Sequence, residues 1–295
     1  MRIKIKLIIF ATLVFIGACV STPISDRSAF IVIPFSQEVS MGTQAYKEIL
    51  AKEKPSTNKK LIQIANRVGH RLAKTTRMTD LKWEFTVVDS KQQNAFALPG
   101  GKTAVYTGIL PVCKNEAGLA AVLGHEIAHV TARHAGQRMS QQFLLMGVMS
   151  VASISMANNS QRGAILGAMG VGAMYGVSLP FGRSNESEAD QIGLIYMAEA
   201  GYDPREAIRF WGRFSKMKDG KKIPEFLSTH PSDNTRLREL QKYLPRALRI
   251  YESRKVKYGL GDTFEAADFN FSEPSPKPSS SEPVKSRSGA VETLK

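Results

Sequence analysis

One pentapeptide, His125-Glu126-Ile127-Ala128-His129, constrains this chain of 295 residues more than any other feature. Histidines four residues apart lie on one face of a helix, where both rings can bind a single Zn²⁺ through nitrogens about 2.0 to 2.1 Å away. Glu126 directly follows the first histidine, so its carboxylate can take a proton from a water bound at the open position of the metal. The pattern therefore predicts a metallohydrolase that binds one zinc ion per chain.

The residues around the pentapeptide predict that its helix is buried. Asn115 can cap the N-terminus, and Glu116 lies in the electropositive first turn. On the side away from the histidines, four apolar residues keep helical spacing: Leu119, Leu123, Ile127 and Val130. A buried helix argues against a chance occurrence of the motif on a solvated surface.

A polar cluster at residues 184–190 supplies candidates for a third zinc ligand. Glu186 and Asp190 are spaced i and i+4 and share a helix face, whereas Glu188 lies about 200° away from Glu186. With Asn185 as the N-cap, Glu188 can close a capping box, which gives it a structural role. This interpretation leaves Glu186 as the metal ligand and Asp190 as a residue that orients a ligand.

Three further histidines need an interpretation. His230 stands in a loop before a proline, and the residues alone do not decide whether it is a turn residue or one directed at the site. His134 lies five residues after His129 and therefore on a different helix face, so we expect a surface position. His70 has no second ligand three or four residues away, and we expect a structural role for it.

Upstream of the motif, the sequence predicts a strand at 83–89 and a β-hairpin formed by 94–101 and 103–107. Pro99 cannot donate to a strand ladder and the two following glycines permit a tight turn, so the first strand of the hairpin should lie at a sheet edge. In a protease, an extended peptide can bind such an edge as one more strand. An ordinary hairpin without this role is equally compatible with the sequence.

Two apolar stretches, 143–156 and 164–177, flank a polar break and are rich in glycine, alanine and methionine. Each is too short to span a bilayer alone. We expect a helical hairpin at 143–177 that packs over or beside the site as a mobile lid. Contact with a membrane surface and a place in the core are the alternatives.

The first 18 residues have the composition of a secretory signal peptide, with three basic residues before an apolar run at 7–16. Ile16-Gly17-Ala18-Cys19 resembles the bacterial lipobox, in which the cysteine carries the lipid after cleavage. A lipidated Cys19 would anchor the protein to a membrane, although an ordinary cleavage site is the alternative. Ser21 follows two residues later, which by resemblance to sorting in Gram-negative bacteria implies the periplasmic face of the outer membrane.

Composition divides the remaining chain into a tether at 19–37, a folded domain at 38–262 and a tail at 263–295. The tail is rich in proline, serine, lysine and glutamate and cannot bury a core, so we expect disorder there. Cys113 is the second of two cysteines and is expected to be buried without a disulfide. In an exported chain, the net charge of +14 favours anionic lipids, acidic substrates or a solvated basic surface over nucleic acid.

Four motifs together resemble one known family: the histidine motif at 125–129, the E-x-x-A-D pattern at 186–190, the hairpin at 94–101 and the His-Pro motif at 228–231. This family of zinc endopeptidases, of the gluzincin type, includes the CAAX prenyl proteases, the HtpX-type membrane peptidases and their periplasmic lipoprotein relatives. The resemblance covers residues 38–248.

The resemblance implies that zinc is bound by His125, His129 and Glu186, and that Glu126 is the general base. It also implies that His230 lies near the metal, where it would stabilise the oxyanion or act as a removable fourth ligand. The sequence contains neither the multi-span core of the prenyl proteases nor the helical repeats of some periplasmic members. Prenyl substrates and a partner docked on repeats are therefore not expected.

We expect a mostly helical, zincin-like α+β domain with a small sheet, acting as a zinc endopeptidase on protein or peptide substrates. The predicted substrates are misfolded or misassembled proteins of the bacterial cell envelope. The rival hypothesis is an envelope chaperone or assembly factor, working with envelope assembly machinery, in which the zinc site is structural or latent.

Overall fold

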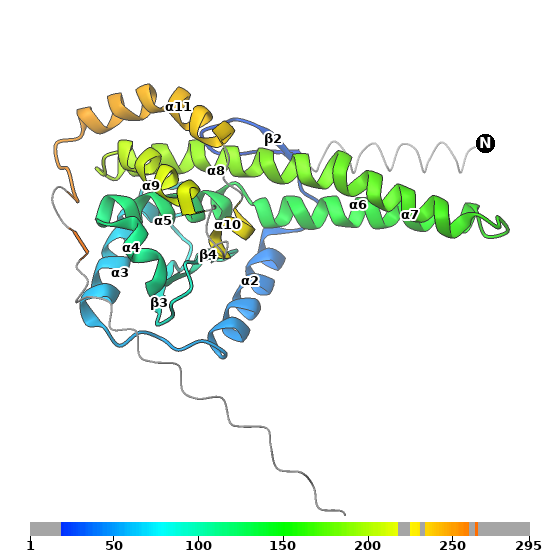
Figure 1. Cartoon of the computed structure of the whole chain (residues 1–295), viewed down its shortest axis with the longest axis horizontal. Coiled ribbons are helices and arrows are strands. Elements are labelled where there is room, and N and C mark those ends of the chain that lie inside the picture. The colour runs from blue at the N-terminus through cyan, green and yellow to red at the C-terminus, as the bar shows by residue number, and fades with distance from the viewer. Residues whose placement is uncertain (1–18, 218–224, 231–233, 260–262, 265–295) are drawn as a thin grey trace, which may run out of the picture.

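The computed structural model describes residues 19–217, 225–230, 234–259 and 263–264. Helices dominate, and a small sheet packs against them, so the predicted mostly helical α+β class is confirmed. Figure 1 shows a rounded domain from which one pair of helices projects. The predicted signal peptide, and all but two residues of the predicted tail, lie outside the described residues.

The helix that carries the histidine motif, α5 (Glu116–Thr131), lies at the centre of the domain, and all of its residues are buried. Asn115 caps it as predicted, because its side-chain oxygen accepts a hydrogen bond of 2.8 Å from the backbone N–H of Gly118. Around it pack α3 (Lys59–Ala73), α8 (Leu179–Glu199) and α9 (Arg205–Lys216).

Two glycines allow α5 and α8 to approach closely. A Cβ atom on Gly193 of α8 would lie 2.8 Å from the carbonyl carbon of Gly124 on α5, which is closer than real side chains come. Because only hydrogens separate the two backbones at this crossing, α8 lies directly beside the helix that carries the histidine motif. A larger residue at Gly193 would therefore displace the part of α8 that contains Glu186.

A three-stranded sheet lies beside α5. Its spatial order is β3 (Glu84–Val88), β5 (Lys102–Tyr106) and β4 (Ala95–Leu98), with β3 parallel and β4 antiparallel to β5. The predicted hairpin is thus present, and its first strand is an edge strand as expected. Gly100 and Gly101 form the turn with φ angles of 93° and 76°, a region that favours glycine.

The remaining elements connect and surround these. These are α2 (Phe35–Leu50), the short η1 (Thr107–Ile109) and α4 (Leu110–Cys113), α10 (Glu225–Thr229) and α11 (Asn234–Ser253). Aromatic residues of α9 and α10 form a buried cluster next to the histidines, with Trp211 stacked on Phe226 at 5.6 Å between ring centroids. Both rings lie edge-on to the ring of His125, at 5.4 and 6.4 Å between centroids.

The segment expected to be a tether contains two short antiparallel strands, β1 (Cys19–Ser21) and β2 (Ser28–Phe30). Ala29, Ile31 and Ile33 are buried. This segment therefore contributes apolar side chains to the domain.

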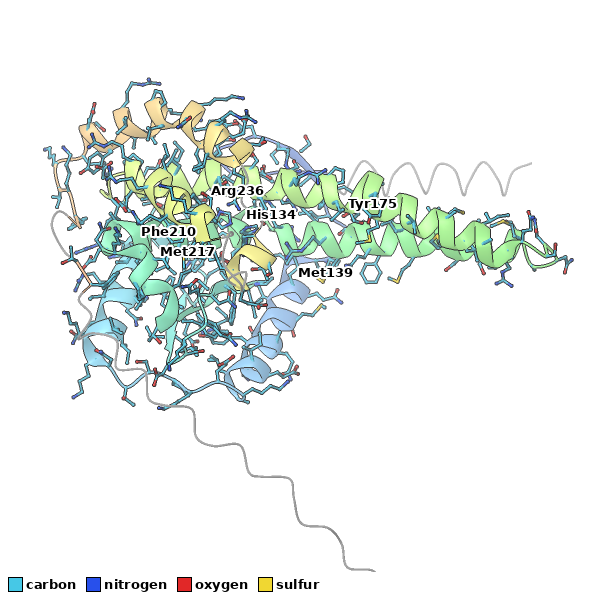
Figure 2. The ribbon with its side chains drawn as sticks, in the orientation of Figure 1. His134, Met139, Tyr175, Phe210, Met217 and Arg236 are labelled. Carbon is cyan, nitrogen blue, oxygen red and sulfur yellow. The ribbon has the colours of Figure 1, made fainter. Side chains whose placement is uncertain are left out.

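The hairpin expected at 143–177 is helical, but it projects away from the domain instead of covering the site (Figure 1). Its first helix is α6 (His134–Ser155). Its second begins with α7 (Arg162–Ala173) and continues through a π-helical turn, η2 (Met174–Ser178), into α8. Figure 2 shows Tyr175 on the projecting part, whereas His134 lies where α6 joins the domain.

Candidate metal centre

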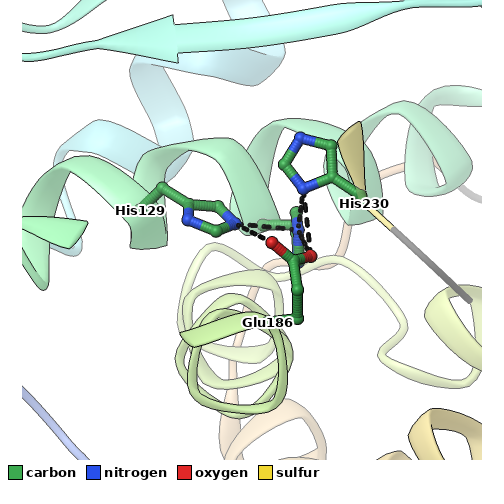
Figure 3. A group of neighbouring side chains, drawn as sticks. His129, Glu186 and His230 are labelled. Carbon is green, nitrogen blue, oxygen red and sulfur yellow. Dashed lines mark hydrogen bonds and ion pairs between the residues drawn. The ribbon is translucent and has the colours of Figure 1, made fainter. Parts of the chain in front are cut away.

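Three of the predicted site residues bring their ligand atoms together. Nε2 of His125 lies 3.1 Å from Nε2 of His129, and these atoms lie 3.2 and 3.4 Å from the carboxylate oxygens of Glu186 (Figure 3). Donors bound to one tetrahedral zinc at about 2.0 to 2.1 Å would lie about 3.3 Å apart. The observed separations and the nitrogen and oxygen donors therefore fit a zinc ion.

His230 joins the same group from the segment after α10. Its Nδ1 lies 3.2 Å from Nε2 of His125 and 3.0 Å from a carboxylate oxygen of Glu186. The ligand-capable atoms of His125, His129, Glu186 and His230 all lie within 4.8 Å of one another. The structure thus answers the question that the sequence left open, because this loop histidine is directed at the site.

Glu126 is buried beside the ligand atoms, and its two oxygens have different surroundings. Oε2 accepts a hydrogen bond of 3.1 Å from the backbone N–H of Ala97, on the edge strand β4. Oε1 has no hydrogen-bond partner among the described residues and lies 3.4 Å from Nε2 of His230. Burial raises the pKa of Glu126, as expected of a carboxylate that exchanges a proton with a nearby water.

Asp190 lies one helical turn beyond Glu186, and its Oδ1 is 2.9 Å from Nδ1 of His125. Arg236 donates two hydrogen bonds of 2.7 Å to this carboxylate and lies 3.3 Å from Glu186. Burial alone would raise the pKa of Asp190, but Arg236 and His125 hold it below its usual value. Asp190 is therefore an anion that can orient the His125 ring.

Sequence reasoning gave no role to Arg236. The guanidinium is buried and stacks over the ring of Trp211, with its central carbon 3.9 Å from the ring centroid. In the sequence it stands near the start of a polar helix, where an exposed arginine is the common case, so there was little signal to find it.

His134 also has a different role from the predicted one. It is completely buried, and its Nδ1 lies 2.9 Å from Nδ1 of His129. Its Nε2 lies 3.1 Å from a carboxylate oxygen of Glu188. Because a carboxylate accepts, Nε2 of His134 donates, and its Nδ1 then accepts from Nδ1–H of His129. This arrangement leaves Nε2 of His129 free for a metal.

The prediction of a surface position for His134 is therefore wrong. The prediction assumed one continuous helix, but α5 ends at Thr131, Arg133 has a φ of 55°, and His134 begins α6. The first turn of α6 lies against α8, which contacts His134 through Glu188. Glu188 does not close a capping box either, because the helix continues through Asn185 and has no end there. It binds His134 instead.

The N-terminal segment reaches the same carboxylate. Nε of Arg27 donates a hydrogen bond of 2.7 Å to Glu188, and the hydroxyls of Thr22 and Ser25 donate to its other oxygen. Burial alone would raise the pKa of Glu188, but His134, Arg27 and the hydroxyls lower it to about 2. Contacts through Glu188 and His134 thus connect residues 22–27 to His129.

A buried helix that presents two histidines, a carboxylate from a second helix and a glutamate beside them defines the class of zinc metallopeptidases. Comparison with known proteins agrees with this class. The model of Peptidase family M48 matches residues 57–244, and the chain belongs to that family. The resemblance inferred from the motifs is therefore confirmed.

Several named relatives are metallopeptidases. The chain is 38% identical over 231 residues to the Mitochondrial metalloendopeptidase OMA1 of Schizosaccharomyces pombe, covering 76% of this chain and 66% of that protein. It is 32% identical to the Beta-barrel assembly-enhancing protease of Yersinia pestis, covering 73% and 45%. It is 35% identical to the human Metalloendopeptidase OMA1, mitochondrial, covering 59% and 35%. The chain thus spans about two thirds of the first of these relatives and less of the others.

These relatives overturn one prediction. The sequence predicts a lipoprotein of the bacterial cell envelope, on the periplasmic face of the outer membrane. The relatives from Schizosaccharomyces pombe, Saccharomyces cerevisiae and Homo sapiens are mitochondrial by name, which points away from that location. The lipobox resemblance rests on only four residues, and such short motifs occur by chance.

Proposed function

We propose that the protein is an endopeptidase in which His125, His129 and Glu186 hold the zinc ion and Glu126 is the general base. When bound, zinc supplies an acidified water and an electrophile that polarises the peptide carbonyl. Glu126 accepts the proton of that water and returns it to the leaving amine. The observation that carries this proposal is the buried Oε1 of Glu126, which lies beside the ligand atoms without a hydrogen-bond partner among the described residues.

Asp190 and His134 act as positioning residues in this proposal. Each contacts Nδ1 of one motif histidine, at 2.9 Å, and so directs Nε2 of that ring toward the metal. Metal-binding histidines commonly have such a partner on the second nitrogen. Carboxylates of α8 thus fix both rings: Asp190 contacts His125 directly, and Glu188 acts on His129 through His134.

We propose that His230 is a removable fourth ligand. A tetrahedral zinc with four protein ligands keeps no open position, whereas a catalytic zinc has three. Because Nδ1 of His230 lies as close to His125 and Glu186 as those residues lie to each other, the arrangement corresponds to a latent state. Replacement by alanine should raise basal peptide cleavage while zinc remains bound.

We propose that the substrates are extended segments of misfolded or misassembled proteins. The free edge of β4 borders the site, because the N–H of Ala97 points away from β5 to Glu126. A substrate in an extended conformation can add to this edge, which holds its backbone near the metal. Two bacterial relatives are named for enhancing β-barrel assembly, which supports substrates that fail to assemble.

The test uses the zinc-loaded full chain with one model protein in its folded and its permanently unfolded form. We expect cleavage of the unfolded form only, lost on chelation, restored by zinc and faster in His230→Ala. If both the wild type and His230→Ala bind zinc but cleave neither form, the proposal fails. The rival function, a chaperone or assembly factor with a closed zinc site, would then be favoured by the four convergent donors.

A further inference from the structure

The projecting hairpin exposes an unusual number of large apolar side chains. On its first helix these include Phe143, Met146, Val151 and Ile154, and on its second Val171, Met174, Tyr175 and Leu179. All residues of α7 are described, and none is buried. Exposed apolar surface of this extent marks a site of interaction with a protein or a membrane.

Among the described residues, one helix is long and apolar enough to cross a membrane, and it is the continuous helix at 162–199. The most apolar 18 residues of this helix have a mean hydropathy of 1.5, and none of them is buried. Each apolar stretch of the hairpin is too short to span a bilayer alone. The second half becomes long because the π-helical turn joins α7 to α8 without a break.

The apolar part of the hairpin is shorter than the hydrocarbon core of a bilayer, by an amount that local thinning can accommodate. The apolar part of α6 from Phe143 onward is about 20 Å long, and the stretch from Gly163 to Leu179 is about 25 Å long, at 1.5 Å per residue. The hydrocarbon core of a membrane is about 30 Å thick. Residues 158–162 form a polar tip between the two helices. Because both segments are helical, their backbone groups are hydrogen-bonded internally, as a lipid environment requires.

We propose that residues 143–181 insert into a lipid bilayer as a helical hairpin. The polar tip extends toward the head groups of the opposite leaflet, with local thinning of the bilayer. The arginines at the base, Arg138 and Arg183, lie at the near interface. The proposal rests on the hairpin alone and is independent of the proposed peptidase activity.

Charge and shape favour lipid over a protein groove as the occupant. The sequence contains no acidic residue from 127 to 185, while arginines stand at the tip and the base, which suits anionic head groups. A helix that docks in a protein groove needs one apolar stripe, but this hairpin is apolar around its circumference. Cβ atoms added at Gly163, Gly167 and Gly172 would meet no described atom within 4 Å, so no other described part of the chain covers these positions.

The N-terminal segment packs against the base of the hairpin. The backbone N–H of Val32 donates a 3.0 Å hydrogen bond to Ser140 on α6, and the guanidinium of Arg27 lies 5.9 Å from the ring centroid of Phe181. Inserting the hairpin would place the metal centre, which adjoins that base, near the membrane surface.

The test uses full-length Tyr175→Trp mixed with vesicles of equal amounts of phosphatidylcholine and phosphatidylglycerol, with and without brominated acyl chains. We expect the bromines to quench the introduced indole, because it lies within the hydrocarbon region. Adding Val171→Asp should abolish this quenching, since an aspartate at the centre of a membrane helix lowers insertion by about a hundredfold.

The matched control is Val256→Asp in the same Tyr175→Trp background. Val256 is 55% exposed and Val171 is 58% exposed, but Val256 lies near the C-terminal end of α11 and should leave quenching unchanged. Binding to the vesicles without quenching of the introduced indole would overturn the proposal, because the apolar run at 7–16 alone would then hold the protein. Disulfide-linked dimers of Val171→Cys formed without lipid, together with absent quenching, would instead identify a second copy as the occupant.

Discussion

His134→Phe is the most informative substitution in the support of the metal centre. Phenylalanine has a similar shape and fills the buried space, but it cannot accept the hydrogen bond from Nδ1–H of His129. A buried donor left without a partner costs about 1 to 3 kcal/mol. Because His129 is then free to rotate or to change tautomer, we expect this cost to appear as about a 5- to 150-fold loss of zinc affinity.

The assay is competition for zinc with a chromophoric chelator, together with thermal unfolding to establish that the variant is folded. His70→Phe is the matched control, because His70 is exposed and its Nδ1 lies 2.8 Å from the backbone oxygen of Asn66, away from the metal centre. A folded His134→Phe protein with the zinc affinity of His70→Phe would refute the inferred link from Glu188 through His134 to the metal. A loss confined to His134→Phe would establish it.

Three further predictions concern residues of α8. Metal analysis should find that Glu186→Ala loses zinc, whereas Glu188→Ala keeps it with lowered affinity; the reverse order would make the ligand assignment wrong. Gly193→Ala should weaken zinc binding, because its Cβ meets the backbone of Gly124, whereas Gly212→Ala should bind zinc normally, since no described atom lies within 4 Å of the added Cβ. Because folding lowers the pKa of Glu188 from 4.5 to about 2, ionised Glu188 stabilises the fold at pH values above 4.5. This contribution should be lost as the pH falls toward 2, and calorimetry of Glu188→Gln should show a weaker dependence of stability on acid.

The sequence predicted those parts of the site that depend on local periodicity. The i, i+4 spacing found both His125 and His129 on one face of α5, and the same spacing selected Glu186 together with Asp190. The proline and glycines after residue 98 correctly predicted the edge strand. These features follow from backbone geometry within one element, which a sequence displays directly.

Other roles depend on which elements meet in space, and the sequence does not display this. His134 and Arg236 are polar residues near helix starts, where solvent exposure is the usual outcome, yet α8 buries both. The apolar residues at 143–177 predicted a helical hairpin, but apolar character alone cannot distinguish a lid from a projection. The predicted location failed because a four-residue motif contains too little information.

Glu126→Gln distinguishes a general base of a zinc peptidase from a carboxylate that only supports the fold. The measurement combines zinc content per chain with the rate of cleavage of an unfolded protein, compared with the wild type under the same conditions. We expect one zinc per chain and a rate about 10² to 10⁴ times lower, because glutamine keeps the shape but cannot take the proton. A Glu126→Gln protein that retains zinc and cleaves at the wild-type rate would contradict the role of Glu126 as general base.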